Sequence, residues 1–283
     1  MSPGTCGCGG ENDASGSHPT CWLEPVEVLA NERVTEGVGL IALAAPRTAR
    51  ALRPGQFVHV RIEQGTDFIL RRPFSVHRVD GERIEILYQV LGRGTRALAE
   101  VVQGTRMDIL GPLGSGFSVP EGAAHALVVA GGLGAAPMGM LVEDLAARGV
   151  AVTAALGAPT VQRLVARELF ERVARRVCVA TDDGSAGELG FVTVLLDRLI
   201  SEDRPDIVYV CGPETMARSV AMAAAAAGIA CEVSLERLMA CGIGACLTCV
   251  VATTSGQKRA CCDGPVFDAK EVLWDAAETP PRH

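Results

Sequence analysis

The stretch Ala126-Leu-Val-Val-Ala-Gly-Gly-Leu-Gly-Ala-Ala-Pro137 determines the architecture expected for the second half of the chain. Its first five residues form a continuous apolar run, which is typical of a parallel strand buried on both faces. Glycines then form a tight turn, and a helix-like segment follows at Met138–Arg148. Later strand candidates, separated by helical segments, are Ala151–Leu156, Val177–Ala180 and Ile207–Val210. This alternation of strand and helix predicts a doubly wound α/β domain.

The segment before this stretch, from Glu24 to about Phe117, has the pattern of an all-β domain. Short β-branched or alternating runs are separated there by Gly, Pro and Asp turn signals. The clearest runs are Phe57–Ile62, Phe74–Val79 and Arg83–Tyr88. Several short strands at this spacing predict a small antiparallel β-barrel.

A cysteine-rich segment follows the α/β region. Three cysteines lie in Leu238-Met-Ala-Cys-Gly-Ile-Gly-Ala-Cys-Leu-Thr-Cys249 with the spacing C-x4-C-x2-C, and the doublet Cys261-Cys262 follows after eleven residues. This spacing is the one that holds a plant-type [2Fe-2S] cluster, in which four thiolates bind two irons. Gly242 and Gly244 let the loop curl closely and direct backbone N–H groups at the sulfurs.

A four-cysteine zinc site and a disulfide pair are the alternatives to a cluster. Zinc usually takes two C-x2-C pairs, and only Cys246 and Cys249 form one here. The spacing therefore favours the iron–sulfur cluster. Because such a cluster carries one electron at a time, it indicates electron transfer and a two-electron partner elsewhere in the chain.

Composition and charge exclude several classes of protein. The 283 residues suffice for two or three domains, and the net charge of −7 argues against nucleic acid or an anionic membrane as partner. The most apolar stretch, Val220–Ile229, is too short to span a bilayer, and no secretory signal pattern opens the chain. No cysteine lies between Cys21 and Cys178. The cysteines thus predict metal binding in a reducing cytoplasm.

Residues 1–20 are rich in Gly, Ser, Asn and Asp without periodicity, which predicts a disordered extension. Cys6, Cys8 and His18 lie in it, and Cys21 lies at its edge. A second metal site is one interpretation. Incidental thiols are the favoured one, because Cys-x-Cys with a single His is not a strong ligand spacing.

The segment Arg71-Arg-Pro-Phe-Ser-Val76 in the β-rich half has residues suited to a flavin. Arg72 can pair with a pyrophosphate, Phe74 can pack on the ring system or ribityl chain, and Ser75 can hydrogen-bond near N5. An ordinary strand with a surface arginine is the alternative.

Three glycine motifs are candidate phosphate or nucleotide contacts. Gly131–Gly134 and Cys211-Gly-Pro213 each follow an apolar strand, so both are expected at the carboxyl edge of one sheet, where such folds bind ligands. The first lacks the third glycine of G-x-G-x-x-G. Gly92–Leu98 opens a short helix with Thr95 near its N-terminus. Each motif alone is equally consistent with a structural turn.

The order of these motifs along the chain resembles that of the ferredoxin–NADP reductase superfamily. The motifs are Arg72-Pro-Phe-Ser75, Gly92–Thr95, Gly131–Pro137 and Cys211-Gly-Pro213. The C-terminal motifs, Met239–Cys249, Cys261-Cys-Asp-Gly-Pro-Val-Phe-Asp268 and Glu271–Trp274, are similar to those of electron-transfer subunits of NAD-dependent, class 1B dihydroorotate dehydrogenases. The resemblance covers roughly residues 24 to 275.

The resemblance implies a multidomain chain. A disordered extension (1–22) would precede an FAD-binding antiparallel β-barrel (23–118), a doubly wound, NAD-binding α/β domain (119–232) and a small [2Fe-2S] domain (233–283). It makes FAD contacts of Arg72, Pro73, Phe74, Ser75, Gly92, Gly94 and Thr95, and nicotinamide contacts of Gly132, Gly134, Cys211, Gly212 and Pro213. The implied iron ligands are Cys241, Cys246, Cys249 and Cys261.

The doublet departs from the family pattern, which has one cysteine separated from Asp-Gly-Pro by a charged residue. That alignment makes Cys261 the ligand and puts Cys262 in the place of the charge, but a ligand swap stays open. His59, His77 and His125 are interpreted as barrel or surface residues, because hydride transfer needs no acid–base pair.

The resemblance implies an electron-transfer subunit of a cytoplasmic complex in pyrimidine biosynthesis. Electrons from an FMN-containing dihydroorotate dehydrogenase subunit, in a dimer of heterodimers, would reach NAD+ through [2Fe-2S] and FAD. The alternatives are an input subunit of a sulfite reductase or sulfhydrogenase complex, and a non-redox binding protein with structural zinc. For NAD or NADP, Arg163 and Arg167 are either phosphate partners or, as favoured, a solvated helix face.

Overall fold

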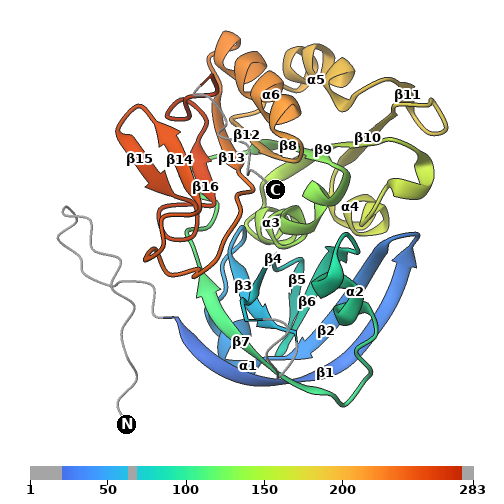
Figure 1. Cartoon of the computed structure of the whole chain (residues 1–283). Helices are drawn as coiled ribbons and strands as arrows, with labels where there is room; N and C mark the ends of the chain where they lie inside the picture. Colours follow the sequence, from blue (N-terminus) through green and yellow to red (C-terminus); the bar gives the residue numbers. More distant parts are fainter. Residues whose placement is uncertain (1–20, 63–68, 276–283) are drawn as a thin grey trace.

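The computed structural model describes residues 21–62 and 69–275, which form two seven-stranded sheets and a small hairpin. The expected disordered extension lies outside the described residues except for Cys21 and Trp22, and Trp22 already begins the first strand. The antiparallel sheet and the α/β sheet face each other, and the cysteine segment lies beside both (Figure 1).

The first sheet is antiparallel, as expected, with the order β4-β3-β7-β1-β2-β6-β5. Its strands are β1 Trp22–Thr35, β2 Val38–Ala44, β3 Phe57–Arg61, β4 Arg72–Ser75, β5 Arg78–Asp80, β6 Arg83–Gln89 and β7 Arg106–Leu113. Two short helices accompany it, α1 Pro46–Ala51 and α2 Arg93–Ala99. Alternate side chains from most of these strands point inward and form one apolar core.

The two edge strands of this sheet are joined by only two residues, so the sheet curls round on itself. The Val76 N–H donates to the Gln56 carbonyl before β3, and the His77 N–H donates to the Glu85 carbonyl of β6. The sequence predicts a single strand over Phe74–Val79, which is wrong. The chain changes partner at Val76 and His77, and the run is divided between β4 and β5.

The second sheet has the order β11-β10-β9-β8-β12-β13-β16. Its strands are β8 His125–Gly131, β9 Ala151–Ala158, β10 Arg176–Thr181, β11 Glu188–Leu189, β12 Ile207–Cys211, β13 Ala230–Ser234 and β16 Val266–Asp268. Its helices are α3 Ala135–Ala147, α4 Arg167–Val173, α5 Leu196–Asp203 and α6 Glu214–Ala226, with 3-10 turns η1 Gly132–Gly134, η2 Val161–Arg163 and η3 Val192–Leu195. The parallel strands and helices expected from the sequence are present with small shifts at their ends.

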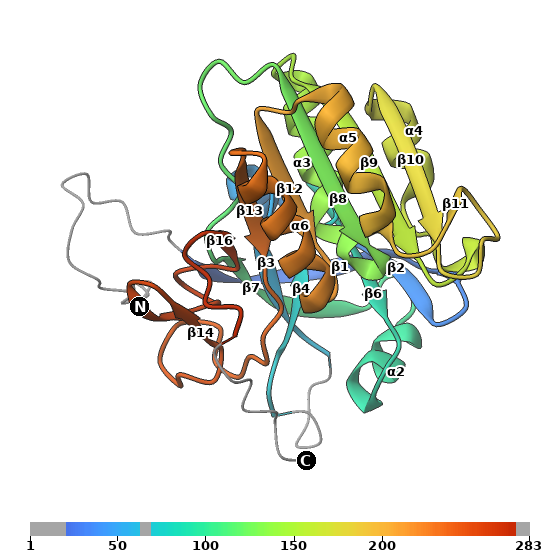
Figure 2. The same ribbon diagram turned by 90° about the horizontal axis from the view of Figure 1, so that it is seen from above.

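Helices cover both faces of this sheet, α3 and α4 on one and α5 and α6 on the other (Figure 2). Leu127 and Val129 of β8 pack in the core with α5 and α6, while Ala126 and Val128 pack with α3 and α4. Both sets are buried, which explains why the sequence of β8 is apolar without interruption.

The cysteine segment is attached to the second sheet. Its strand β16 pairs antiparallel with β13, and its hairpin consists of β14 Val250–Thr253 and β15 Gly256–Arg259. Cys249 and Cys261 share a core with Phe57 of β3 and with the α6 side of the sheet. The segment thus packs against both sheets.

Candidate functional site

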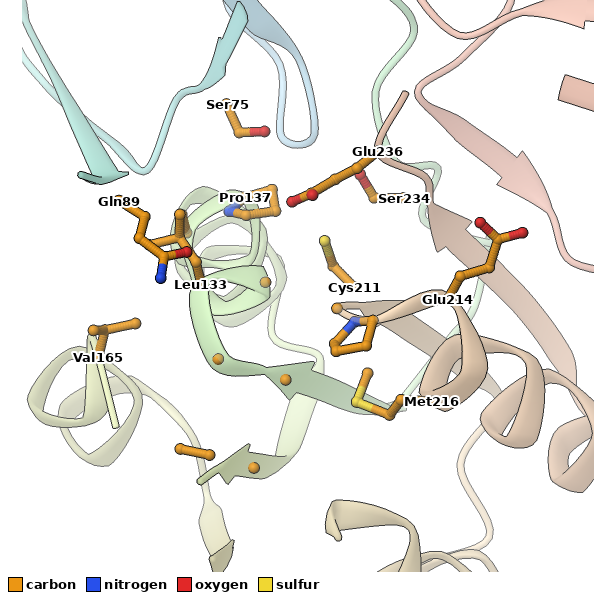
Figure 3. Close-up of a pocket in the computed structure, with 18 of the residues that line it drawn as sticks. Ser75, Gln89, Leu133, Pro137, Val165, Cys211, Glu214, Met216, Ser234 and Glu236 are labelled. Atoms are coloured by element: carbon orange, nitrogen blue, oxygen red, sulfur yellow. The ribbon is translucent and has the colours of Figure 1, made fainter. Parts of the chain in front are cut away.

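A cleft of about 1320 Å³ separates the antiparallel sheet from the carboxyl edge of the parallel sheet. Single ligand pockets usually measure about 300–1,000 Å³, so this cleft has room for more than one cofactor. Its walls come from β4 and β6 on one side and from the ends of β8, β9, β12 and β13 on the other. Figure 3 shows Ser75 and Gln89 across the cleft from Cys211 and Glu214.

The flavin candidates on β4 lie in the cleft wall. Pro73, Phe74 and Ser75 line it together with Phe57 of the neighbouring strand. The Phe74 ring contacts the Tyr88 ring edge-on, with the ring centroids 6.3 Å apart. These contacts give the wall an aromatic surface with a hydroxyl beside it, which is the chemistry suited to a flavin ring.

Arg72, Gly92 and Gly94 lie outside the lining found among the described residues. The Arg72 Nη1 donates to the Leu70 carbonyl at 2.7 Å. A methyl group on Gly94 would approach the Arg72 Nε to 3.2 Å, so the guanidinium lies against this glycine. Arg72 and the turn before α2 are therefore adjacent, although they are twenty residues apart in the chain.

Thr95 lines the cleft and also closes the turn before α2. Its Oγ1 accepts hydrogen bonds from the Leu91 N–H at 2.9 Å and the Gly92 N–H at 3.1 Å. The hydroxyl thus serves as a cap, which is the structural alternative that the sequence left open.

The nicotinamide candidates meet at the carboxyl ends of β8 and β12, as the sequence predicts. Gly132, Gly134, Cys211, Gly212 and Pro213 all line the cleft. A methyl group on Gly134 would overlap the Cys211 carbonyl and lie 2.8 Å from the Gly212 nitrogen. The two loops therefore pack backbone against backbone, which only glycine at position 134 permits.

The Cys211 thiol is buried in this wall. Burial, together with the negative charge of Glu236, raises the pKa of Cys211 to about 12. The thiol stays neutral at physiological pH, so it contributes a small polarizable surface and not a nucleophile.

Two arginines after β9 have different surroundings. Arg167 pairs with Glu171 on α4, with Nε and Oε1 2.7 Å apart, which fits the favoured solvated face. Arg163 lines the cleft, contrary to that interpretation, because η2 turns it back toward the carboxyl edge of the sheet. It is a cation available to the ligand in this cleft.

Several cleft residues were not expected from the sequence. They are the group at the end of β13 and just after it (Ser234, Leu235, Glu236, Arg237 and Met239), together with Gln89 and Val165. The Arg237 Nη1 pairs with the Glu214 Oε2 at 2.8 Å and so joins α6 to the segment before the cysteines. Ligands of such folds bind at the carboxyl ends of the parallel strands, so a prediction of β13 as a further parallel strand would have identified this group.

The cysteine thiols lie together in two pairs. The Cys246 thiol contacts Cys241, and the Cys261 N–H donates to the Cys249 Sγ at 3.4 Å. Each iron of a [2Fe-2S] cluster takes two of four thiolates, so two pairs fit this donor set. No three described His, Cys, Asp or Glu side chains meet around a single point suited to a metal ion.

Hydrogen bonds in this segment favour thiolates. The Gly244 N–H donates to the Cys261 Sγ at 3.1 Å, and the Ile243 N–H donates to the Cys241 Sγ at 3.5 Å. Hydrogen bonds from Thr248 lower the pKa of Cys246 to about 6, and a hydrogen bond with Cys262 lowers the pKa of Cys261 to about 6. Burial raises the pKa of Cys249 to about 11.

The two members of the doublet have different surroundings. Cys261 is 2 % exposed, and Cys262 is half-buried, with its Sγ 3.8 Å from the Cys261 Sγ. Cys261 also contacts Cys249, the last cysteine of the loop. This geometry favours Cys261 as the fourth ligand.

Of the three histidines in the described part of the chain, His59 has the least ordinary environment. It lies on β3, as a barrel residue should, but it is completely buried and neither ring nitrogen has a hydrogen-bond partner among the described residues. Burial, with the positive charge of Arg71, lowers the pKa of His59 to about 4. His77 and His125 have partners, the Ala136 carbonyl and the Thr153 hydroxyl.

Two family models match the chain. The "Iron-sulfur cluster binding domain of dihydroorotate dehydrogenase B" matches residues 236–273, which hold five cysteines, the four expected ligands and Cys262. The "Oxidoreductase NAD-binding domain" matches residues 128–222, which contain both glycine loops. Among the described residues, no helix has the length and apolarity needed to cross a membrane.

Curated relatives resemble the chain over most of its length. The electron transfer subunit of dihydroorotate dehydrogenase B (NAD(+)) from Desulforamulus reducens is 40 % identical over 255 residues, covering 88 % of this chain and 97 % of the relative. The same subunit from Caldanaerobacter subterraneus subsp. tengcongensis is 39 % identical over 257 residues, covering 89 % and 99 %.

Solved structures share the fold. An NADH-dependent reduced ferredoxin-NADP oxidoreductase, studied for flavin-based electron bifurcation, superposes with a TM-score of 0.81 at 31 % identity, over 88 % of this chain and 90 % of that one. A ferredoxin NADP+ reductase from Neisseria gonorrhoeae superposes with a TM-score of 0.62 at 18 % identity, over 73 % and 92 %, a likeness of fold.

Proposed function

The chain belongs to the family of electron-transfer subunits of dihydroorotate dehydrogenase B (NAD(+)), and we propose that it carries electrons from a separate FMN-containing catalytic subunit to NAD+. It is a component of an NAD-dependent oxidoreductase, with FAD and a [2Fe-2S] cluster as its other cofactors. The cluster supplies one-electron steps, and FAD converts them into hydride transfer. The relatives favour this function over a sulfite reductase or sulfhydrogenase subunit.

One observation carries the proposal: the cysteine segment forms part of the wall of the cleft. Met239 and Pro265, which flank the first and last cysteines, line the cleft together with Phe57 of β3. A flavin seated on β4 is then adjacent to the segment that holds the cluster, so the chain itself provides a short route for electrons.

We assign the roles in the cleft as follows. Phe74 and Ser75 hold the flavin ring, and Arg72 with the Gly92–Thr95 turn holds its pyrophosphate. Gly132, Gly134 and Cys211–Pro213 present backbone and a neutral thiol to the nicotinamide. The hydride step itself needs only that the two rings be positioned and water be excluded. Because the cluster would supply electrons alone, the flavin would also have to take up one proton for each pair of electrons before it could give hydride to NAD+.

Replacing Arg72 with alanine is expected to lower the FAD content of the purified protein several-fold, with the cluster retained. Arg72 would lose its charge-assisted contact to a phosphate, a type of hydrogen bond that contributes about 1.5–3 kcal/mol. The measurement is flavin per chain by absorbance after denaturation, with iron measured in parallel.

Arg71→Ala is the matched control, because Arg71 carries the same charge but is ion-paired with Asp108. Its FAD content should stay close to that of the unsubstituted protein. Equal FAD content in the unsubstituted protein and in both variants would show that Arg72 does not bind FAD.

For the partner subunit we propose a docking surface around the cysteine loop, called here the loop patch and made of Leu238, Ile243 and Leu247. These side chains are 62 %, 36 % and 64 % exposed, and Cys246 between them is exposed as well. Leu247 has a positive φ of 58°, which is rare for a leucine and worth keeping only where the surroundings or the function require it. The FMN-containing subunit is the occupant because electrons enter at the cluster.

Leu247→Asp is expected to weaken binding of the FMN-containing subunit at least tenfold, because a buried unpaired carboxylate costs more than about 1.4 kcal/mol. Iron and FAD contents should not change. Leu189→Asp is the control, since Leu189 is 72 % exposed on β11 at the opposite edge of the sheet. Co-purification with the FMN-containing subunit measures binding by each variant. An equal loss of binding in the Leu247→Asp and Leu189→Asp proteins would argue against this surface.

We further propose that the complex is a dimer of heterodimers in the cytoplasm, and that the chain has the three domains given above, with two boundaries moved to strand ends: Trp22 opens the first domain and Ser234 closes the second. The cytoplasm is proposed because the cysteine segment has the spacing of a cluster site and not of a disulfide framework. Light scattering of the co-purified complex measures its stoichiometry directly.

An anaerobic visible spectrum with iron, acid-labile sulfide and flavin analysis tests the core of the proposal. We expect about two irons, two sulfides and one FAD per chain, and bleaching of the flavin by NADH. Zinc without sulfide, and no flavin, would leave a non-redox binding protein as the function.

A further inference from the structure

His59 is a buried polar side chain whose hydrogen-bonding groups are unused. The residue is 0 % exposed, and both ring nitrogens lack a partner among the described residues. Buried polar groups in folded proteins are nearly always hydrogen-bonded, and an exception usually has a functional reason or a missing ligand. Either tautomer of the ring leaves one N–H donor without an acceptor.

The ring of His59 lies against the cysteine loop, with Gly242 over the ring face near Cε1. A methyl group on Gly242 would lie 2.7 Å from the His59 Cε1 and 2.9 Å from both ring nitrogens. Gly242 follows Cys241 directly and has a φ of +72°, so the loop turns at this residue against the ring. Only glycine allows this approach, because any side chain at position 242 would collide with the ring.

The other surroundings of His59 belong to the flavin side of the cleft. His59 pairs with Pro73 across β3 and β4, and its ring centroid lies 5.7 Å from that of Phe57, which lines the cleft. His59 thus lies between the strand assigned to FAD and the loop assigned to the cluster. Its two unpartnered nitrogens lie next to the loop, and its ring packs toward the flavin wall.

We propose that His59 donates a ring N–H hydrogen bond to a sulfur of the [2Fe-2S] cluster and thereby raises the reduction potential of the cluster. This inference rests on the function proposed above. An N–H donor stabilises the additional negative charge of the reduced cluster, so hydrogen bonds to cluster sulfurs raise its potential. His59 is therefore a positioning and tuning residue that sets the energy of electron exchange between cluster and FAD.

The first test is pulsed EPR of the reduced full-length protein in which all histidines carry ¹⁵N. A ¹⁵N coupling to the cluster spin is the expected result, because a hydrogen bond delivers spin density from a cluster sulfur to the donor nitrogen. Absence of any histidine coupling in a protein with full iron and sulfide overturns the inference. Absence of iron and sulfide would instead be a failure of the proposed function, so the two failures are distinct.

Variants assign the coupling to His59. His59→Leu should abolish it and lower the midpoint potential of the cluster, measured by redox titration, with iron content unchanged. His59→Gln keeps an N–H donor and should recover part of the potential. His77→Gln is the control, because the ring of His77 already contacts the Ala136 carbonyl, and it should leave the potential unchanged. A His59→Leu protein with an unaltered potential overturns the proposal.

If the His59 variants fail to hold the cluster, a second ¹⁵N-histidine protein that keeps His59 tests the proposal. His18 and His283 are replaced by asparagine, and the ¹⁵N-histidine experiment is repeated. His77 then contacts α3 and His125 contacts Thr153 of β9, so His59 is the histidine that faces the cysteine loop. A retained coupling supports His59 as the donor, and a lost coupling overturns it.

Discussion

Cys261→Ala is expected to lose the [2Fe-2S] cluster, whereas Cys262→Ala keeps it. Cys261 accepts the Gly244 N–H at 3.1 Å and contacts Cys249, so it completes the second thiol pair. Its pKa is lowered by the hydrogen bond with Cys262, which favours the thiolate that iron binds. Cys262 would then act by donating to the ligand, and its removal should alter the spectrum without releasing iron.

Iron and acid-labile sulfide per chain, measured anaerobically on both variants, decide between the two thiols. The reverse result, with the cluster lost from Cys262→Ala alone, would make Cys262 the ligand. A cluster retained in both single variants but lost in the double variant would show that either thiol can serve. FAD content is the control, because the flavin wall lies on β4 and not on the cysteine segment.

Gly134→Ala is expected to abolish NADH-dependent reduction of the flavin and to lower the free energy of unfolding by about 1–3 kcal/mol, the usual cost of overpacking. The added methyl group would overlap the Cys211 carbonyl and crowd the Gly212 nitrogen. Both neighbours are backbone, which cannot rotate away as a side chain does. The two loops that form the nicotinamide wall would therefore have to separate.

Gly132→Ala is the matched control in the same turn. A methyl group on Gly132 would meet no atom within 4 Å, although its φ of +55° makes alanine unfavourable by about 1–2 kcal/mol. We expect a smaller loss of flavin reduction by NADH than with Gly134→Ala, with FAD and iron contents unchanged in both. Stopped flow measures the rate of flavin reduction by NADH in each variant. Comparable rates in the two variants would contradict the role proposed for the contact between the Gly134 and Cys211 loops.

Much of the α/β half could be predicted because its signals are local. The strand Ala126–Ala130 is apolar on both faces since helices cover both, and the glycines after it form the turn that leads directly into α3. The C-x4-C-x2-C spacing was equally informative, because cluster chemistry fixes the distances between thiolates within one loop.

The remainder depends on contacts between segments that are distant in the chain. Nothing in Phe74–Val79 indicates that its two halves pair with opposite edges of one sheet, because that change follows from the curl of the whole sheet. The Glu236–Arg237 part of the cleft was missed for a similar reason, since its position depends on β13 ending at the same edge as β12.

His59 shows the same limit most clearly. The sequence alone identifies His59 only as a residue of a barrel strand or of the surface. Its importance comes from Gly242, which lies far along the chain and contacts the ring only after both segments have folded. Burial without a partner is a property of the assembled structure, and no local pattern encodes it.

The pairing of β16 with β13 has a consequence for the order in which the protein matures. β16 comes after all four proposed ligands, so the edge of β13 stays open until the ribosome has made the chain as far as Asp268. An uncovered strand edge invites pairing with other chains. A nascent chain that stalls within the cysteine segment would therefore lack both a complete cluster site and its protection against aggregation, which makes it an early target for proteolytic quality control.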